Sequence, residues 1–145
     1  MTEQLWIDET DAMVLHDRLL ALHGGAAGVR DEALLKSALA RPRQHFASSE
    51  HADIIHLATV YTAAIVRNHM FVDGNKRTGF VVGILFLEIN GFDSVATEEE
   101  AAAAVLALAS GDFNDNDYEA FLKDNVRQSG PGPESAHARA LHVLA

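Results

Sequence analysis

Residues 69–79, HMFVDGNKRTG, place a histidine, an acid, an amide, two cations and a hydroxyl between the two most apolar segments of the chain. The segment IIHLATVYTAAIV (54–66) precedes this stretch, and FVVGILFLEI (80–89) follows it. Both are apolar on nearly every side, which is typical of helices in the middle of a bundle. A turn between two buried helices needs only Gly74 and Asn75. The other polar side chains therefore require a functional explanation.

The rest of the chain also has helical patterning, with no alternating strand pattern longer than a few residues. Caps and stop residues predict helices over residues 8–23, 31–41, 49–67 and 75–90, with two more beginning at Thr97 and at Asn114 or Asp115. Pro42 is expected to end the second of these helices. We predict an all-α fold: a compact helical bundle in which two buried central helices flank the motif loop.

Two segments lie outside this helical pattern. Residues 42–50, PRQHFASSE, read as a polar connector before the first central helix. The tail SGPGPESAHARALHVLA begins with glycine, proline and serine, as a flexible linker does. We therefore expect one domain over residues 1–128 and a flexible tail over 129–145.

Composition narrows the classes of function. The 145 residues include no cysteine, and the acidic N-terminus lacks the apolar region of a signal peptide. No apolar run approaches the roughly 20 residues that cross a bilayer, so we expect a cytoplasmic protein without a membrane partner. The net charge of −10 argues against nucleic-acid binding. Residues 41–80 nevertheless carry a net charge of +2, and such a locally basic region suits the binding of a small anion such as a nucleotide.

The cations of the motif point to that anion. Asn75 is expected to open a helix, whose first N–H groups lack internal partners and carry the positive end of the helix dipole. Lys76 and Arg77 add two charges there, at a dipole cost of about 0.3–1 kcal/mol each. A purely structural turn gains nothing from this arrangement, whereas a phosphate-binding turn does.

The remaining motif residues complete a reaction site. Asp73 would repel a phosphate unless a divalent cation lay between them, and Mg²⁺ is commonly held by one carboxylate plus substrate phosphates. His69, just across the turn, could accept a proton from a nucleophile. Phe71 is expected to anchor the loop in the core. A lone histidine before a turn is more often a helix cap, but the coincidence of all these groups favours phosphoryl or nucleotidyl transfer.

Residues 69–77, HMFVDGNKR, resemble the signature of the Fic/Doc family, His-x-Phe-x-(Asp/Glu)-Gly-Asn-(Gly/Lys)-Arg, at every specified position. The resemblance extends over about residues 5–125 and implies an all-α bundle. It assigns the general base to His69, the Mg²⁺ ligand to Asp73, and the nucleotide and phosphate site to Gly74, Asn75, Lys76 and Arg77. Arg67 lies outside the motif and receives no role.

Three positions favour one branch of that family. AMP-transferring Fic enzymes usually have Pro after the His, Gly after the Asn, and a second Arg, where this chain has Met70, Lys76 and Phe80. The chain is in this respect similar to the death-on-curing (Doc) toxins. That resemblance implies a kinase-like toxin that binds ATP in the reverse orientation to the AMP-transferring enzymes. Such a toxin transfers the γ-phosphate to a Thr hydroxyl of elongation factor Tu and stops translation. A lysine side chain also fills space that glycine would leave for a closely bound phosphate.

The resemblance also implies partners. The connector 42–50 falls where the family has a flap that pairs edge to edge with an extended target segment. The inhibitory pattern (Ser/Thr)-x-x-x-Glu-(Gly/Asn) of many Fic enzymes is lacking, because Ser94 to Glu98 is followed by Glu99. A separate, Phd-like antitoxin is therefore expected, as a disordered segment that folds into a helix on the bundle.

Three alternatives stay open. An AMP transferase would fit the same motif, although Lys76 and Phe80 count against it. A metal phosphohydrolase could use His16-Asp17, but a solvated helix face explains that pair. His51 and His56 are five positions apart, a poor spacing for two metal ligands on one helix face. A catalytically inactive interaction module would be favoured by loss of His69 or Asp73, and both are present.

Overall fold

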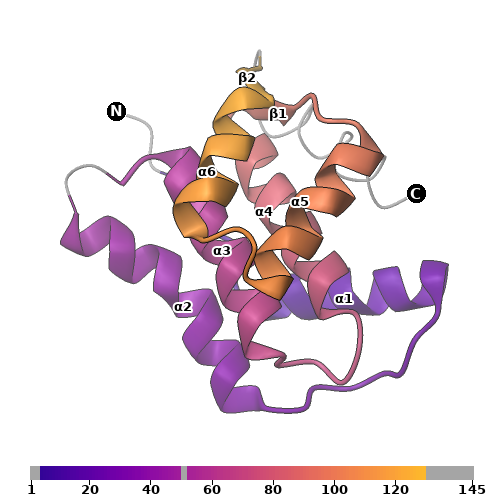
Figure 1. Cartoon of the computed structure of the whole chain (residues 1–145). Coiled ribbons are helices and arrows are strands. Elements are labelled where there is room, and N and C mark those ends of the chain that lie inside the picture. The colour runs from indigo at the N-terminus through magenta and orange to yellow at the C-terminus, as the bar shows by residue number, and fades with distance from the viewer. Residues whose placement is uncertain (1–3, 50–51, 130–145) are drawn as a thin grey trace.

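The computed structural model describes residues 4–49 and 52–129. Within these ranges it contains six helices and one two-stranded antiparallel sheet (Figure 1). The elements, in chain order, are α1 (Glu9–His23), α2 (Glu32–Ser48), α3 (Ile54–Asn68), α4 (Asn75–Ile89), β1 (Phe92–Ser94), α5 (Glu98–Ser110), α6 (Asp115–Asp124) and β2 (Val126–Gln128). The predicted all-α bundle is confirmed. Apart from Ser129, the expected tail lies outside the described residues.

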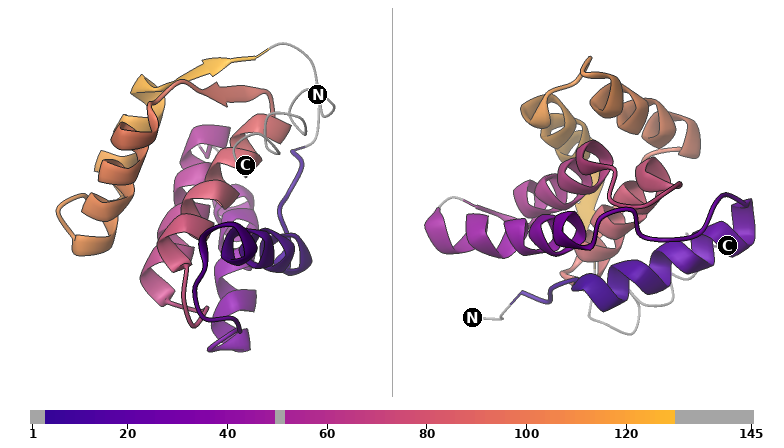
Figure 2. Two further views of the ribbon diagram at one scale, coloured as in Figure 1. Left: turned by 90° about the vertical axis from the view of Figure 1, so that its right-hand side faces the viewer. Right: turned by 90° about the horizontal axis from the view of Figure 1, so that it is seen from below.

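Helices α3 and α4 form the centre of the bundle, with α1 and the α5–α6 pair on opposite sides of them (Figure 2). Every residue of α3 from Leu57 to Val66 is buried. The two helices approach closely because α4 has glycine at two contact points. A Cβ on Gly79 would lie 2.8 Å from Val66 Cγ2, and a Cβ on Gly83 would collide with Thr62 Oγ1. The hydroxyl of Thr62 instead donates to the carbonyl of Gly79 across the interface (2.8 Å).

Helix α2 does not end where Pro42 predicts. It continues to Ser48 with Pro42 buried inside it. A proline within a helix removes one backbone hydrogen bond and usually breaks the helix. Here the following turn packs on Trp6: the Arg43 guanidinium lies 5.2 Å from the indole centroid, and Phe46 meets that ring edge-on at 5.6 Å. These tertiary contacts favour continuation of the helix, so the predicted connector is wrong over residues 42–48.

One further helix boundary and a small sheet differ from the sequence prediction. Helix α3 begins at Ile54, because Asp53 caps it by accepting from the backbone N–H of His56 (2.7 Å). Strands β1 and β2 were not predicted. They pair antiparallel over three residues each, with Asp93 opposite Arg127. The strands are too short to show an alternating pattern, and they form where the ends of α4 and α6 come together (Figure 1). The predicted caps of the last two helices, Thr97 and Asn114, are confirmed.

The N-terminal segment is held against the two central helices. The buried hydroxyl of Tyr61 on α3 donates to the carbonyl of Ile7 and accepts from its N–H, both at 2.9 Å. Burial raises the pKa of Tyr61 to about 12. Asn90, at the end of α4, exchanges two hydrogen bonds with the backbone of Leu5.

No helix in the described ranges is long and apolar enough to cross a membrane.

Candidate active site

The motif loop joins α3 to α4 and exposes its polar groups at one end of the helix pair. His69 caps the C-terminus of α3 in a left-handed conformation (φ 48°, ψ 48°), the only positive φ at a non-glycine residue in the described ranges. Such backbone conformations are costly and cluster at functional sites. The side chains of His69, Asp73, Lys76 and Arg77 are exposed, whereas Met70 and Phe71 are buried in the core.

Arg30 fixes the backbone beside His69, a contribution that the sequence did not predict. Its Nε donates to the carbonyl of His69 (2.7 Å), and its Nη2 donates to the carbonyl of Asn68 (3.1 Å). The last carbonyls of a helix lack internal partners and carry partial negative charge, so a guanidinium there is favourable. No local pattern reveals this contact, because Arg30 and His69 are 39 positions apart.

The segment before α2 lies along the motif loop. Val29 forms an antiparallel bridge with Phe71, and the N–H of Val72 donates to the carbonyl of Gly28 (3.0 Å). The carbonyl of Met70 accepts from the backbone of both Arg30 and Asp31. The extended segment beside the motif is therefore residues 24–31, whereas the predicted docking connector at 42–50 is helical as far as Ser48.

The N-terminus of α4 differs from every other helix start in the described residues. The other five helices begin with an Asp, Thr or Asn side chain that caps a backbone N–H. Helix α4 begins after Gly74 (φ 79°), has no side-chain cap and has no acid in its first turn. Its first N–H groups are therefore available to an external anion, with the exposed Lys76 and Arg77 beside them.

Asn75 contributes to this turn through its buried side chain. Its Oδ1 accepts from the N–H of Phe71 (3.0 Å), and its Nδ2 donates to the carbonyl of Phe71 (2.9 Å). The two bonds close the loop between Phe71 and the first turn of α4. The side chain of Asn75 thus holds the loop in shape, and any role of this residue toward an anion belongs to its backbone.

We predict that Asn75→Ala destabilises the protein and lowers its activity together. The substitution leaves the buried N–H and C=O of Phe71 without partners, at about 1–3 kcal/mol for each unsatisfied group. Chemical denaturation and a transfer assay on the same sample measure both effects. Asn125→Ala is the matched control, because the Asn125 side chain donates to only one carbonyl, that of Phe121 in α6. Full stability of Asn75→Ala would contradict this account of the loop.

The carboxylate of Asp73 can still coordinate a cation. Its Oδ1 accepts from the N–H of Gly74 (2.8 Å), and its Oδ2 accepts from the N–H of Ala26 (3.3 Å). Each oxygen keeps a further lone pair, and hard carboxylate oxygens suit Mg²⁺. Within the described ranges, no group of three His, Cys, Asp or Glu side chains could hold a metal ion. The donor set therefore fits an ion bound through one carboxylate and completed by substrate phosphates.

His16 is a buried part of this site, contrary to the solvated face expected for His16-Asp17. The residue is 2% exposed, its ring stacks on Phe71 at 3.8 Å, and its Nε2 lies 2.7 Å from the carbonyl oxygen of Asp73. The side chain of Asp17 is 77% exposed. The apolar helix face on which His16 lies was the signal in the sequence that pointed to burial.

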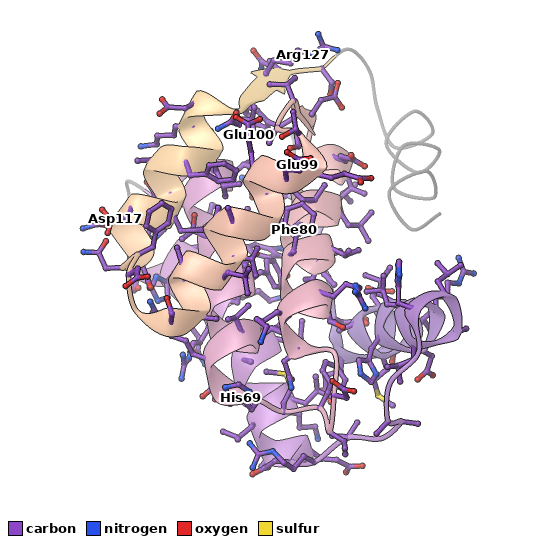
Figure 3. The ribbon with its side chains drawn as sticks, turned by 45° about the vertical axis from the view of Figure 1, so that its right-hand side comes forward. His69, Phe80, Glu99, Glu100, Asp117 and Arg127 are labelled. Carbon is purple, nitrogen blue, oxygen red and sulfur yellow. The ribbon has the colours of Figure 1, made fainter. Side chains whose placement is uncertain are left out.

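The other polar residues considered from the sequence lie elsewhere. Arg67 pairs with Asp115 on α6. His56 bonds to Glu119 at 2.6 Å, and His51 lies outside the described residues. Figure 3 shows His69 at one end of the helix pair and Glu99 and Glu100 toward the other. A hydrogen bond from the Thr97 backbone lowers the pKa of the Glu100 carboxyl, which accepts it within the capping box of α5.

Sequence comparisons relate the chain to known proteins. A model of the Fic/DOC family matches residues 6–87. Two curated proteins are similar to the chain. "Protein kinase doc" of Escherichia phage P1 is 30% identical over 108 residues, which cover 74% of this chain and 85% of that protein. "Toxin Doc" of Mycolicibacterium smegmatis is 38% identical over 74 residues, which cover 50% and 57% of the respective chains.

Proposed function

We propose that this chain, which belongs to the Fic/DOC family, is the toxin of a toxin–antitoxin system and a protein phosphotransferase. The names of the two relatives, a protein kinase and a toxin, support this proposal. The observation that carries it is the uncapped N-terminus of α4, which lies beside two exposed cations, an exposed carboxylate and an exposed histidine.

The proposed reaction transfers the γ-phosphoryl group of ATP to a hydroxyl of a protein target. His69 accepts the hydroxyl proton as the target oxygen bonds to the γ-phosphorus, and the bond from that phosphorus to the bridging oxygen breaks to leave ADP. Lys76, Arg77 and the first N–H groups of α4 hold the phosphates. Mg²⁺ bound to Asp73 would supply charge neutralisation. Such reactions depend mainly on positioning and electrostatic stabilisation.

The proposed target is a Thr hydroxyl of elongation factor Tu, as the resemblance to Doc toxins implies. An extended target segment needs a backbone edge near His69 with which to pair. Residues 24–31 are the candidate for that edge, because they run beside the motif loop: Val29 forms a bridge with Phe71, and the carbonyl of Gly28 accepts from the N–H of Val72. This assignment replaces the connector at 42–50, whose residues up to Ser48 have their backbone bonds inside α2.

The identity of the transferred group can be tested with labelled ATP. We expect label from the γ-phosphate, and none from the α-phosphate, on elongation factor Tu, because the Lys76 side chain occupies space that an α/β-phosphate would need. Lys76→Gly should lower γ-transfer and could open the site to AMP, with Phe80 still in place of the second arginine. Transfer of α-label by the wild-type chain would instead identify an AMP transferase. Label from neither position would favour an inactive interaction module.

We predict that a cognate, Phd-like antitoxin binds this chain. The nearest match to the inhibitory pattern ends at Glu98 and lacks the Gly or Asn that should follow it, and the neighbouring Glu99 lies toward the opposite end of the helix pair from His69 (Figure 3). Expression of the chain alone should therefore stop growth, and co-expression with the antitoxin should restore it, with both proteins co-purifying. The His69→Ala chain should be harmless and still co-purify. Harmless high-level expression of an active chain with no partner gene would contradict this prediction.

A further inference from the structure

We propose that His16 of α1 is a positioning residue for Asp73, acting through the peptide bond between Asp73 and Gly74. This inference rests on the proposed function, in which the Asp73 carboxylate faces the Mg²⁺ of the nucleotide. His16 itself lies beneath the loop, 2% exposed, and would contact neither metal nor substrate. Its contribution would be to hold the carboxylate in one orientation.

The Asp73–Gly74 peptide is held at both ends. Its carbonyl oxygen lies 2.7 Å from His16 Nε2, and its N–H donates to the Oδ1 of Asp73 itself at 2.8 Å. A carbonyl oxygen can only accept, so Nε2 must carry the proton. The other ring nitrogen, Nδ1, is 3.9 Å from the nearest oxygen of Asp17 and makes no hydrogen bond there.

The ring of His16 also supports the loop by contact. It stacks on Phe71 with a centroid distance of 3.8 Å and an interplanar angle of 8°. A Cβ built on Gly74 would lie 3.6 Å from Nε2, so the ring also packs against this residue. His16 therefore contacts the loop on both sides of Asp73, from a helix that is far away in the sequence.

This support matters because glycine follows Asp73. Gly74 has φ of 79°, and glycine populates positive and negative φ with similar ease. Without a fixed donor, the peptide between Asp73 and Gly74 could rotate. Rotation would turn the Gly74 N–H away from Oδ1, and the carboxylate would lose the bond that orients it toward the phosphate site. A preorganised ligand binds more tightly because it has less to order on binding.

Two substitutions separate the hydrogen bond from the packing. His16→Phe keeps an aromatic ring for the stack on Phe71 and removes the donor. His16→Gln keeps a donor at about the position of Nε2 and removes the ring. Asp17→Asn, on the adjacent exposed position, is the control. The readouts are calorimetric binding of Mg²⁺ with a non-hydrolysable ATP analogue, the amide hydrogen exchange of Gly74 without nucleotide, and the thermal midpoint.

We expect His16→Phe to weaken Mg²⁺ binding about tenfold, the effect of losing one hydrogen bond that orients the ligand. Exchange of the Gly74 amide should quicken in the same variant without nucleotide. His16→Gln should remain within about twofold of the wild type in Mg²⁺ binding, even where its thermal midpoint falls. A purely structural role would lower the thermal midpoint in both variants and leave the Mg²⁺ affinity of the folded protein unchanged, which would overturn the proposal.

The wild-type chain gives a test that needs no variant. Nitrogen chemical shifts of His16 should identify the Nε2–H tautomer, and an Nδ1–H tautomer would overturn the proposal even if His16→Phe failed to fold. Failure of the proposed function would look different. A wild-type chain that bound no Mg²⁺ with nucleotide, yet showed the Nε2–H tautomer and slow Gly74 exchange, would refute the phosphotransferase assignment and with it the functional role of a correctly described contact.

Discussion

Replacement of His69 by alanine should reduce phosphoryl transfer by at least about 100-fold, which is the usual contribution of a general base. Growth inhibition should disappear with it. The fold should persist, because the His69 side chain is exposed and Arg30 bonds to its backbone carbonyl rather than to its ring. Transfer of γ-label and the thermal midpoint, measured on the same preparation, separate loss of chemistry from loss of structure.

Two variants sharpen the result for His69. Histidine tolerates the left-handed conformation better than alanine does, so His69→Ala carries a small backbone penalty. His69→Gly removes that penalty at φ 48° and should be equally inactive, with no loss of stability from this source. His23→Ala, at the exposed end of α1, should transfer like the wild type. Toxicity of His69→Ala equal to wild type would rule out His69 as the base.

Replacement of Asp73 by asparagine should lower transfer by about 100-fold at limiting Mg²⁺, because the amide keeps the shape of the side chain and removes its charge. The asparagine Oδ1 can still accept from the N–H of Gly74, so the turn should survive. The longer bond from Ala26 is lost if the amide nitrogen takes the place of Oδ2. The measurement is the transfer rate as a function of Mg²⁺ concentration.

The Mg²⁺ dependence distinguishes a metal ligand from a loop contact. Part of the lost rate should return at high Mg²⁺ if asparagine only weakens ion binding. Asp17→Asn changes the same charge at an exposed site away from the motif and should leave the Mg²⁺ dependence unchanged. Equal transfer by the wild type and Asp73→Asn at limiting Mg²⁺ would show that Asp73 does not bind the ion that assists the reaction.

Local patterns in the sequence were sufficient for most of the helices and for the position of the motif. The all-round apolar segments before His69 and after Gly79 predicted the two central helices, since such segments are stable only when buried on every side. Thr97 and Asn114 predicted helix starts, because a cap bonds to a backbone N–H within three residues. The nine motif residues are contiguous, so their spacing and their place between two helices could be read directly from the chain.

Contacts between distant residues decided the rest. The packing of Arg43 and Phe46 on Trp6 carries α2 past Pro42, against a strong local signal. Strands β1 and β2 pair with each other from distant parts of the chain. The support of the motif loop by His16 and Arg30 spans 57 and 39 positions, respectively. No local preference encodes such pairs, because each contact exists only when the bundle has brought its partners together. The sequence therefore determined which groups the loop carries, and the tertiary structure decided how they are held.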